Sequence, residues 1–385
     1  MKKRQVAILD FGSSKLSAIV GEQGVNNTFV VKGKREIAYE GFFEGEFLDL
    51  EELEEALEKI IADLRSDCKE PFTRLYVGIP GEFVTVVLKE KTISYERKKK
   101  ITQREVNELY DEAYRLKTNR YRIVNRSAIY FVLDDNRRIV NPIGLTSEKL
   151  GGYVSYSLAD VSFERIVRPM LDKAGVNDVV FVSSALAESM YLFEPEQRDR
   201  FAMLLDVGHL TSTLVILRGD GLLYQKSIPF GGGLITADLC GYLNVGYATA
   251  DNLKRKISIS RSAPAAVYEI SDGEEVYAFP AEKCNDVVRN NLDTLCESVE
   301  DCLSHCEVKF PENLTLYVTG GGVLPMRGCK EYIANRLNRV VDGIVPNSPT
   351  ENKPTDSSKF GLLHYALRKE ETENVGFLQK IFGRR

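Results

Sequence analysis

The chain has 385 residues, 43% of them hydrophobic and 28% charged, which is the composition of a globular protein long enough for two or more cores. Its formal net charge of −5 gives no support to nucleic-acid binding. No run of about 20 apolar residues exists to span a bilayer. The basic start MKKRQ leads into a predicted strand rather than a signal peptide, so we expect a cytoplasmic protein.

The first predicted element is a hairpin that carries an acid and a glycine. An apolar strand at residues 6–9 leads into Asp10 and Gly12, and a second apolar strand begins at Leu16. Gly12 allows the backbone to bend sharply and to approach a ligand, and successive N–H groups in such a turn form a concavity that suits phosphate. Many ordinary hairpins contain Asp and Gly, so this segment alone does not identify a binding site.

Mixed strands and helices follow this hairpin. Residues 29–35 and 36–41 predict further strands, residues 49–64 predict an amphipathic helix, and residues 75–80 predict a buried strand. This alternation suits one half of a ribonuclease-H-like α/β protein.

The character of the sequence changes from Thr85 to about Leu158. The charged run at residues 96–100 could bind a partner, although a solvated turn before a helix explains it more simply. A capping box at Thr102 and Glu105 predicts the start of that helix. Three alternating strands are then expected, at residues 126–133, 139–143 and 150–158.

A second copy of the hairpin begins at Phe201, after a predicted helix, strand and connecting helix at residues 163–174, 179–182 and 185–193. Its apolar strand leads into Asp206 and Gly208, hydroxyl residues begin at Thr211, and another apolar strand continues to Leu217. Two such hairpins, roughly 200 residues apart, predict two similar halves that hold a ligand with a phosphate tail between them. A later strand ends in three glycines, where a flat base or a ribose could lie close: Gly320, Gly321 and Gly322.

The seven cysteines and three histidines indicate neither a disulfide framework nor a zinc site. Cys302 and Cys306 lie one helical turn apart with His305 between them, which could suggest a metal. However, an apolar stripe at helical spacing runs through the same segment, so reduced thiols on or near a buried face are the better interpretation. The stripe comprises Val288, Leu292, Leu295, Val299, Cys302 and Leu303.

The two hairpins and the glycine segment, in this order and spacing, resemble the phosphate-one, phosphate-two and adenosine motifs of the actin-like ATPases. Within that superfamily the chain most resembles the FtsA family of bacterial cell-division proteins, along nearly its whole length. The resemblance implies an α/β, actin-like (ribonuclease-H-like) two-domain fold with a nucleotide cleft and an FtsA-type inserted subdomain.

The resemblance also implies domain boundaries. The first ribonuclease-H-like subdomain is expected at residues 1–83 and 160–195, and the inserted subdomain at 84–159. The second ribonuclease-H-like subdomain is expected at 196–230 and 310–368, with a small helix-rich subdomain at 231–309. A linker at 369–374 and an amphipathic membrane-targeting helix at 375–385 complete the chain.

ATP and Mg²⁺ are the ligands that the resemblance implies. The backbone from Gly12 to Ser14, helped by the Ser13 and Ser14 hydroxyls, would hold the β-phosphate, and Lys15 could reach the phosphates or remain a solvated hairpin residue. Two acids would face the metal from opposite halves through water, because Mg²⁺ gives up its hydration shell reluctantly. These acids are Asp10 and Asp206, and the residues expected over the γ-phosphate are Gly208, His209 and Thr211.

The adenosine end of the ligand is assigned by the same resemblance. Gly231 and Gly232 resemble the glycine pair before the helix that follows phosphate-two. Asp251 and Lys254 resemble an acid and a lysine that reach the ribose and base, although a plain salt bridge within a helix suits this pair equally well. The backbone of Gly320 to Gly322 would pass under the adenine.

Two departures from the family pattern concern hydrolysis. Gly208 is followed by His209 and Leu210 where the family usually has further glycines. Many relatives also place an acid at the start of the connecting helix, where this chain has Ser183 and Ser184. Because a carboxylate there would orient the attacking water, we predict ATP binding with slow or no hydrolysis and assign no catalytic residue.

The C-terminal segment GFLQKIFGRR predicts a membrane anchor. It follows a polar stretch rich in Lys and Glu, and its apolar residues share one helical face beside three basic residues. The alternative is a last helix packed on the body of the protein. The predicted membrane-binding residues are Phe377, Leu378, Lys380, Ile381, Phe382, Arg384 and Arg385.

The function that the resemblance implies is a nucleotide-dependent filament protein at the cytoplasmic face of the inner membrane, at the division septum. Its expected partners are further copies of itself, the FtsZ C-terminal peptide near the helices that end at about Cys306, and other division proteins at the inserted subdomain. A sugar kinase of the same fold is one alternative, but no catalytic Asp signature is present. An FtsA-like pilus-assembly platform protein, which reaches membranes through partners, is the other.

Overall fold

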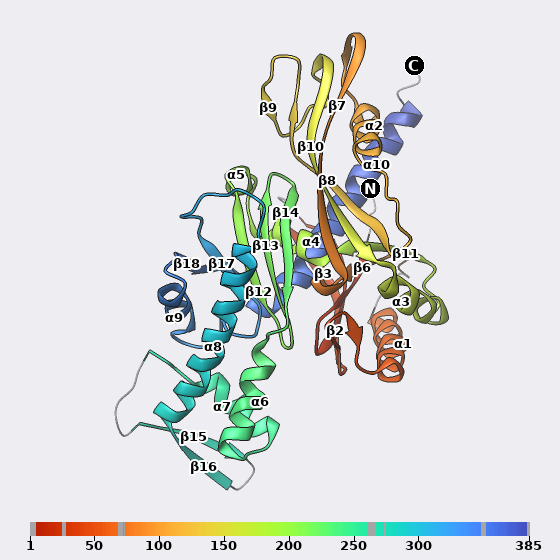
Figure 1. Ribbon diagram of the computed structural model, residues 1–385. Helices are drawn as coiled ribbons and strands as arrows, with labels where there is room; N and C mark the ends of the chain where they lie inside the picture. Colours follow the sequence, from red (N-terminus) through yellow and green to blue (C-terminus); the bar gives the residue numbers. More distant parts are fainter. Residues whose placement is uncertain are drawn as a thin grey trace.

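The computed structural model describes residues 5–24, 28–67, 72, 74–260, 266–272, 275–347 and 352–382, with only the backbone described at 272, 275 and 373–382. Two five-stranded sheets form the two halves of the molecule, with a four-stranded sheet projecting at one end and a two-stranded hairpin at the other (Figure 1). Within the described residues, no helix combines the length and apolar content needed to cross a bilayer.

The first half is built on a sheet with the strand order β11-β6-β1-β2-β3. Its strands are β1 (Gln5–Phe11), β2 (Lys15–Gln23), β3 (Phe29–Ala38), β6 (Arg74–Ile79) and β11 (Asp178–Ser183). Strand β1 pairs antiparallel with β2 and parallel with β6, and the two strands expected at 29–41 are largely one strand, β3. A small hairpin and a 3₁₀ turn lie nearby: β4 (Phe42–Phe43), β5 (Glu46–Phe47) and η1 (Gly81–Phe83).

Alternate residues of β1 enter two different cores, as the period of a strand requires. Ala7 and Leu9 pack with α1 (Leu50–Asp67) and α3 (Val161–Lys173), whereas Val6 and Ile8 pack with residues of α4 (Ser184–Leu192) and α10 (Ser357–Phe382). The first sheet is therefore covered by helices on both faces, and the amphipathic helix predicted at 49–64 is confirmed as α1.

The second half repeats this plan with the strand order β14-β13-β12-β17-β18. Its strands are β12 (Ala202–Val207), β13 (Ser212–Arg218), β14 (Gly221–Ile228), β17 (Leu316–Thr319) and β18 (Val341–Gly343). Strand β12 pairs antiparallel with β13 and parallel with β17, as β1 does with β2 and β6. The short helix α5 (Pro195–Asp199) leads into it, and η2 (Pro354–Asp356) leads from it into α10.

Helix α4 lies between the halves and belongs to both. Ala187 packs in the core of the first sheet, whereas Ala185 and Leu186 pack with residues of β12 and β13. The connecting helix predicted at 185–193 is thus confirmed, and its almost uniformly apolar sequence follows from burial on both sides.

The four-stranded sheet β7-β10-β8-β9 is inserted between β6 and α3 and is covered by α2 (Gln103–Ala113). Its strands are β7 (Val84–Lys100), β8 (Tyr121–Val132), β9 (Arg138–Ile139) and β10 (Thr146–Asp160). The capping box of Thr102 and Glu105 is present. The basic run at 96–100 is the end of β7 rather than a turn, because this stretch pairs with β10, with Lys99 opposite Ser147. Lys99 also pairs with Glu105 at 2.8 Å across the strand–helix junction.

The other face of the second sheet packs against α6 (Gly232–Leu243), α8 (Ala281–Ser304) and α9 (Cys329–Arg336). Helix α7 (Tyr247–Lys256) and the hairpin of β15 (Val267–Asp272) and β16 (Glu275–Pro280) complete this region. Cys302 is buried and Cys306 is half-buried, and both are free thiols, which fits the interpretation of the cysteine segment as part of a core. Cys68 lies outside the described residues.

Helix α10 runs without a break from Ser357 to Phe382, so residues 369–374 are helical and the linker expected there differs from the structure. Neither Gly nor Pro occurs between Leu362 and Val375 to end the helix. Glu370 also anchors this stretch, since it accepts hydrogen bonds from Arg74 Nη1 at 2.8 Å and Tyr76 Oη at 2.9 Å. The side chains of the predicted anchor lie outside the described part, and so do Arg384 and Arg385 entirely.

Candidate functional site: a cleft between two Asp-Gly turns

The β1–β2 turn and the β12–β13 turn face each other across a cavity of about 450 Å³. Their tips touch, because the backbone N–H of Leu210 donates a hydrogen bond to Ser13 Oγ at 3.0 Å. The predicted site residues that line the cavity are Asp10, Gly12, Ser13, Ser14, Lys15, Asp206, Gly208, His209, Thr211, Gly232, Asp251, Lys254, Gly320, Gly321 and Gly322.

The first turn is held rigidly by its own backbone and by a buried tyrosine. The N–H of Gly12 donates to the carbonyl of Lys15 at 3.0 Å, and Tyr39 Oη donates to the carbonyl of Gly12 at 2.9 Å. Lys15 Nζ is paired with Glu36 at 2.8 Å, and both side chains are partly exposed. The lysine predicted to reach a phosphate is therefore engaged at the rim of the cavity.

The second turn packs against the glycines of two other segments. The N–H of Gly232 donates to the carbonyl of Gly208 at 2.9 Å, and the N–H of Gly322 donates to the carbonyl of Val207 at 2.8 Å. Gly320 has a φ of +86°, and a Cβ there would lie 2.3 Å from Asp206 Oδ1, so only glycine fits. Gly231 is not among the lining residues, because it packs on the backbone of His209.

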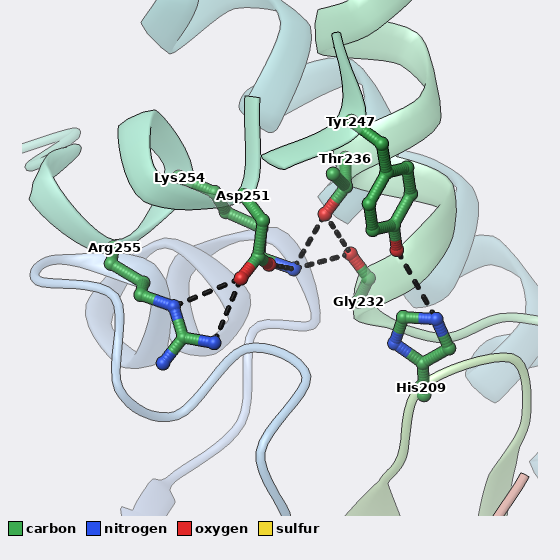
Figure 2. Close-up of polar contacts among 7 residues, drawn as sticks. All are labelled: His209, Gly232, Thr236, Tyr247, Asp251, Lys254 and Arg255. Carbon is green, nitrogen blue, oxygen red and sulfur yellow. Dashed lines mark hydrogen bonds and ion pairs between the residues drawn. The ribbon is translucent and has the colours of Figure 1, made fainter. Parts of the chain in front are cut away.

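The wall on the α7 side is an ion-paired network rather than a set of free side chains (Figure 2). Lys254 is buried, and its Nζ donates to the carbonyl of Gly232 at 2.8 Å and to Thr236 Oγ1 at 2.7 Å, and pairs with Asp251 at 3.1 Å. Asp251 also pairs with Arg255 at 2.8 Å. These contacts match the salt-bridge alternative for Asp251 and Lys254, and a role in holding the ribose stays a prediction.

His209 closes the same wall from the second turn. Its Nε2 lies 3.2 Å from the hydroxyl of Tyr247, at the start of α7 (Figure 2). Burial and the nearby Lys254 lower the pKa of His209, so the ring is neutral at pH 7 and carries no charge toward a phosphate.

The two predicted metal-facing acids lie at the floor of the cavity, where Asp10 is buried and Asp206 is half-buried. Asp10 Oδ1 accepts hydrogen bonds from Ser358 Oγ at 2.9 Å and from Ser184 Oγ at 3.3 Å. Burial raises the pKa of Asp10, and burial together with the Asp10 carboxylate raises the pKa of Asp206 to about 7. Each acid is thus close enough to make ionisation of the other costly.

A third buried acid, Glu188 on α4, lines the cavity and was missed by the sequence interpretation. Its side chain is 3% exposed, and burial, Asp206 and Asp10 raise its pKa well above the usual value. The start of the connecting helix carries Ser183 and Ser184, as the sequence indicated, and the helix brings an acid to the cleft one turn after Ser184. The signal was a single Glu in the otherwise uncharged helix SALAESMYL.

The residues of the floor fit a hydrated divalent cation. Asp10, Asp206 and Glu188 supply carboxylates, while the lining lysines Lys15 and Lys254 are already paired with other acids. In the described chain, no three His, Cys, Asp or Glu side chains are grouped so that they could hold a metal directly. Contacts through water suit Mg²⁺, which keeps several waters in most protein sites.

The sequence is similar to those of known cell-division proteins. The profile of a family described as "SHS2 domain inserted in FTSA" matches residues 81–156. Cell division protein FtsA of Buchnera aphidicola subsp. Baizongia pistaciae is 21% identical over 391 residues, covering 96% of this chain and 92% of the relative. Cell division protein FtsA of Escherichia coli K12 is 20% identical over 255 residues, covering 66% of this chain and 60% of the relative.

Solved structures show the same fold. The PilM–PilN type IV pilus biogenesis complex matches with a TM-score of 0.63 and 18% identity, covering 95% of this chain and 99% of that chain. MreB5 of Spiroplasma citri bound to AMPPNP matches with a TM-score of 0.56 and 13% identity, covering 98% and 100%. The predicted actin-like α/β fold with an FtsA-type insertion is thereby confirmed.

Proposed function

Since the chain belongs to the FtsA family of actin-like proteins, we propose that it is an ATP-binding cell-division protein that assembles into filaments at the membrane and tethers FtsZ filaments there. The observation that carries the nucleotide part is the single cavity enclosed by the two Asp-Gly turns and the glycine segment 320–322. MreB5 of Spiroplasma citri, which has a similar fold, is known with AMPPNP bound, which supports nucleotide binding by this fold.

The two turns would hold the phosphates from opposite sides. Ser13 Oγ and the N–H of Leu210, which now bond to each other, are the groups that a phosphate would engage instead. Backbone N–H groups of Ser13 and Ser14 add donors on one side, whereas the N–H of Gly12 already bonds to the Lys15 carbonyl, and Gly208 and Thr211 line the other side. Mg²⁺, when bound, offsets phosphate charge, and Asp10 and Asp206 would orient its water ligands.

Bare glycine backbone beside the cavity provides a test of nucleotide binding. Gly321 lines the cavity, and a Cβ there would lie 2.6 Å from Thr355 Cγ2, so Gly321→Met displaces the Thr355 side chain but no backbone and places a side chain in the proposed adenine position. We expect calorimetry with Mg²⁺ and ATP to show binding by the wild type and at least about tenfold weaker binding by Gly321→Met. Gly241→Ala, whose Cβ meets nothing within 4 Å, is the matched control.

Either of two results would end the nucleotide proposal. One is a wild-type protein that does not bind ATP, and the other is a Gly321→Met variant that binds it as tightly as Gly241→Ala does. A separate measurement of phosphate release, on the same protein that is used for the calorimetric binding curve, tests whether bound ATP is hydrolysed. Glu188 brings a carboxyl group to the cleft one turn after Ser184, and slow or absent hydrolysis stays a prediction that this measurement tests.

Membrane attachment and partner binding have their own assays. We expect the full chain to float with liposomes that contain anionic lipids, and a chain truncated after Glu373 to stay in the soluble fraction. Undiminished flotation of the truncated chain would refute the membrane anchor, and with it the argument against a pilus-assembly platform protein.

Co-pelleting of membrane-bound protein with the FtsZ C-terminal peptide tests whether the chain tethers FtsZ. A peptide that stays in the supernatant would refute the tethering proposal.

A further inference from the structure

A second cavity, of about 490 Å³, lies where the inserted sheet meets the second half of the molecule; we call it the junction cavity. Strands β7 to β10 contribute its lining on one side, and β13, β14 and the segment after α8 contribute it on the other (Figure 1). It shares no lining residue with the cleft between the two Asp-Gly turns. Its volume is typical of a small-molecule site, since such sites enclose roughly 300–1,000 Å³.

The buried part of this lining is apolar and is held by backbone contact. Ile129 and Leu223 are buried, and they come from opposite sides of the junction. Gly219 has a φ of +57°, and a Cβ there would lie 2.3 Å from the carbonyl oxygen of Ile129, so the two sides touch through their backbones. Because backbone closes the junction, the junction cavity is formed before a ligand arrives.

Three half-buried aromatic rings line the same cavity: Tyr130, Tyr153 and Phe201. The rings of Tyr130 and Tyr153 lie 5.7 Å apart, measured between centroids. Phe201 has a φ of +85°, a conformation that bulky residues rarely adopt, and its N–H donates to the carbonyl of Arg198 at 3.2 Å. Backbone strain of this kind is concentrated at ligand clamps, so the strained position of the Phe201 ring is a second indication of a site.

Two arginines stack on these rings without a carboxylate partner in the described part of the chain. The guanidinium carbons of Arg138 and Arg218 lie 4.6 and 5.9 Å from the centre of the Tyr130 ring, and that of Arg218 also lies 4.9 Å from the Phe201 ring. Arg218 Nε donates to the carbonyl of Asp199 at 3.3 Å. The stacked guanidinium groups therefore retain N–H donors for an anion, which they bind through a planar fork.

The combination of rings and unpaired arginines selects the class of ligand. An inorganic anion would leave the aromatic walls unused, and a neutral apolar molecule would bury the guanidinium groups without a counter-charge. A flat ring that carries an anionic group uses both features. The other charged residues of the lining are Lys309 and Glu307, so three cations face one acid and the balance favours an anion.

We propose that the junction cavity binds an aromatic anion of about the size of a nucleoside monophosphate. The ring of the ligand stacks among Tyr130, Tyr153 and Phe201, and its anionic group accepts hydrogen bonds from Arg138 and Arg218. Nucleoside phosphates and aromatic carboxylates share this chemistry. The inference does not rest on the proposed function, because the junction cavity and the cleft have separate linings.

Calorimetry on the full-length protein, with the wild type and Gly321→Met in parallel, tests this inference. The probes are guanosine monophosphate and indole-3-acetate, which have a ring and an anion, with guanosine and inorganic phosphate as the separate parts. We expect at least one of the first two to bind both proteins with a dissociation constant below about 1 mM, at least about tenfold more tightly than either part. Guanosine monophosphate alone would indicate a nucleoside phosphate, and indole-3-acetate alone an aromatic carboxylate.

Arg138 provides the variant that removes the anion contact. It is exposed, and its side chain stacks only on Tyr130, so Arg138→Gln should weaken binding at least about tenfold and leave the melting temperature unchanged. Arg138→Lys keeps the charge but loses the planar fork, so it should recover only part of the affinity. Arg137→Gln is the matched control, because Arg137 is an exposed neighbour that pairs with Asp135 and does not line the junction cavity.

Four results would overturn the inference: neither ring-bearing anion binds, guanosine or phosphate binds as tightly, Gly321→Met no longer binds, or Arg138→Gln binds as tightly as Arg137→Gln. Binding that is lost in Gly321→Met would belong to the cleft. Failure of the wild type to bind ATP would refute the proposed function and leave this result standing.

Discussion

Phe163 holds together an aromatic cluster beneath the first phosphate turn, and its removal should be costly. The side chain is fully buried, and its ring lies 5.1 Å from the rings of both Phe11 and Phe83, measured between centroids. Rings of Phe47 and Phe181 lie at 5.8 and 6.1 Å. Truncation of such a residue removes the transfer energy of the ring and leaves a cavity, which together cost about 4 kcal/mol.

We therefore expect Phe163→Ala to lower the free energy of unfolding by about 4 kcal/mol and Phe163→Leu by about 1 kcal/mol, because leucine fills most of the space. Urea unfolding followed by far-UV circular dichroism is the assay, since the chain has no tryptophan to report by fluorescence. Loss of less than about 1 kcal/mol in Phe163→Ala, with an unchanged urea dependence, would refute the reasoning.

The same cluster predicts an effect on binding. Phe11 is the last residue of β1 and immediately precedes Gly12, so a loosened ring cluster should weaken ATP binding as well as stability. Leu292→Ala is the matched control, because Leu292 is fully buried in α8 of the second half and should cost similar stability without loosening the first turn. Equal loss of ATP affinity in both variants would contradict the link.

Three further predictions concern buried groups. Lys359→Met should cost about 3 kcal/mol by urea unfolding, because it removes a fully buried cation that pairs with both Glu36 and Asp356. Lys34→Met removes a more exposed lysine whose pair with Asp356 is longer, so it should cost under about 1 kcal/mol, and equal losses would contradict this. Burial lowers the pKa of His364 to about 4, so the free energy of unfolding of the wild type should fall as the pH drops from about 6.5 toward 4. In melts at several pH values, His364→Gln should show a weaker dependence of stability on pH, and an equal dependence in both proteins would refute this. Gly320→Ala should abolish ATP binding in the same calorimetry, because its Cβ would collide with Asp206.

The parts of the fold that the sequence predicted are those with strong local periodicity. The repeated hairpins, α1 and the Thr102–Glu105 capping box each depend on residues that are neighbours in the chain. The charged run at 96–100 was misplaced because its pairing partner in β10 lies about 50 residues away. The helical state of 369–374 depends on contacts of Glu370 with β6, which the local polar composition does not reveal.

The site residues that could be predicted are those in turns marked by glycine. The residues whose surroundings depend on burial by distant elements could not be predicted. Asp10, Gly12 and Gly208 were found because acid–glycine turns are visible in sequence. Lys254 was expected at a ligand, but its three contacts with Gly232, Thr236 and Asp251 appear only when α6 and α7 pack together. Glu188 was missed because a single Glu in a helix is normally solvated, and only the packing of α4 between two sheets buries it.

Helix α10 begins beside the cleft between the two Asp-Gly turns and continues to Phe382 (Figure 1). Its 26 residues span about 39 Å, with Ser358 bonded to Asp10 at one end and Glu370 braced against the first sheet midway. Because Glu370 holds the helix near its middle, the first and last turns lie on opposite sides of a common pivot. A tilt of about 5° around Glu370 displaces each end by about 2 Å, so a movement at Asp10 is accompanied by an opposite movement of similar size at the last turn.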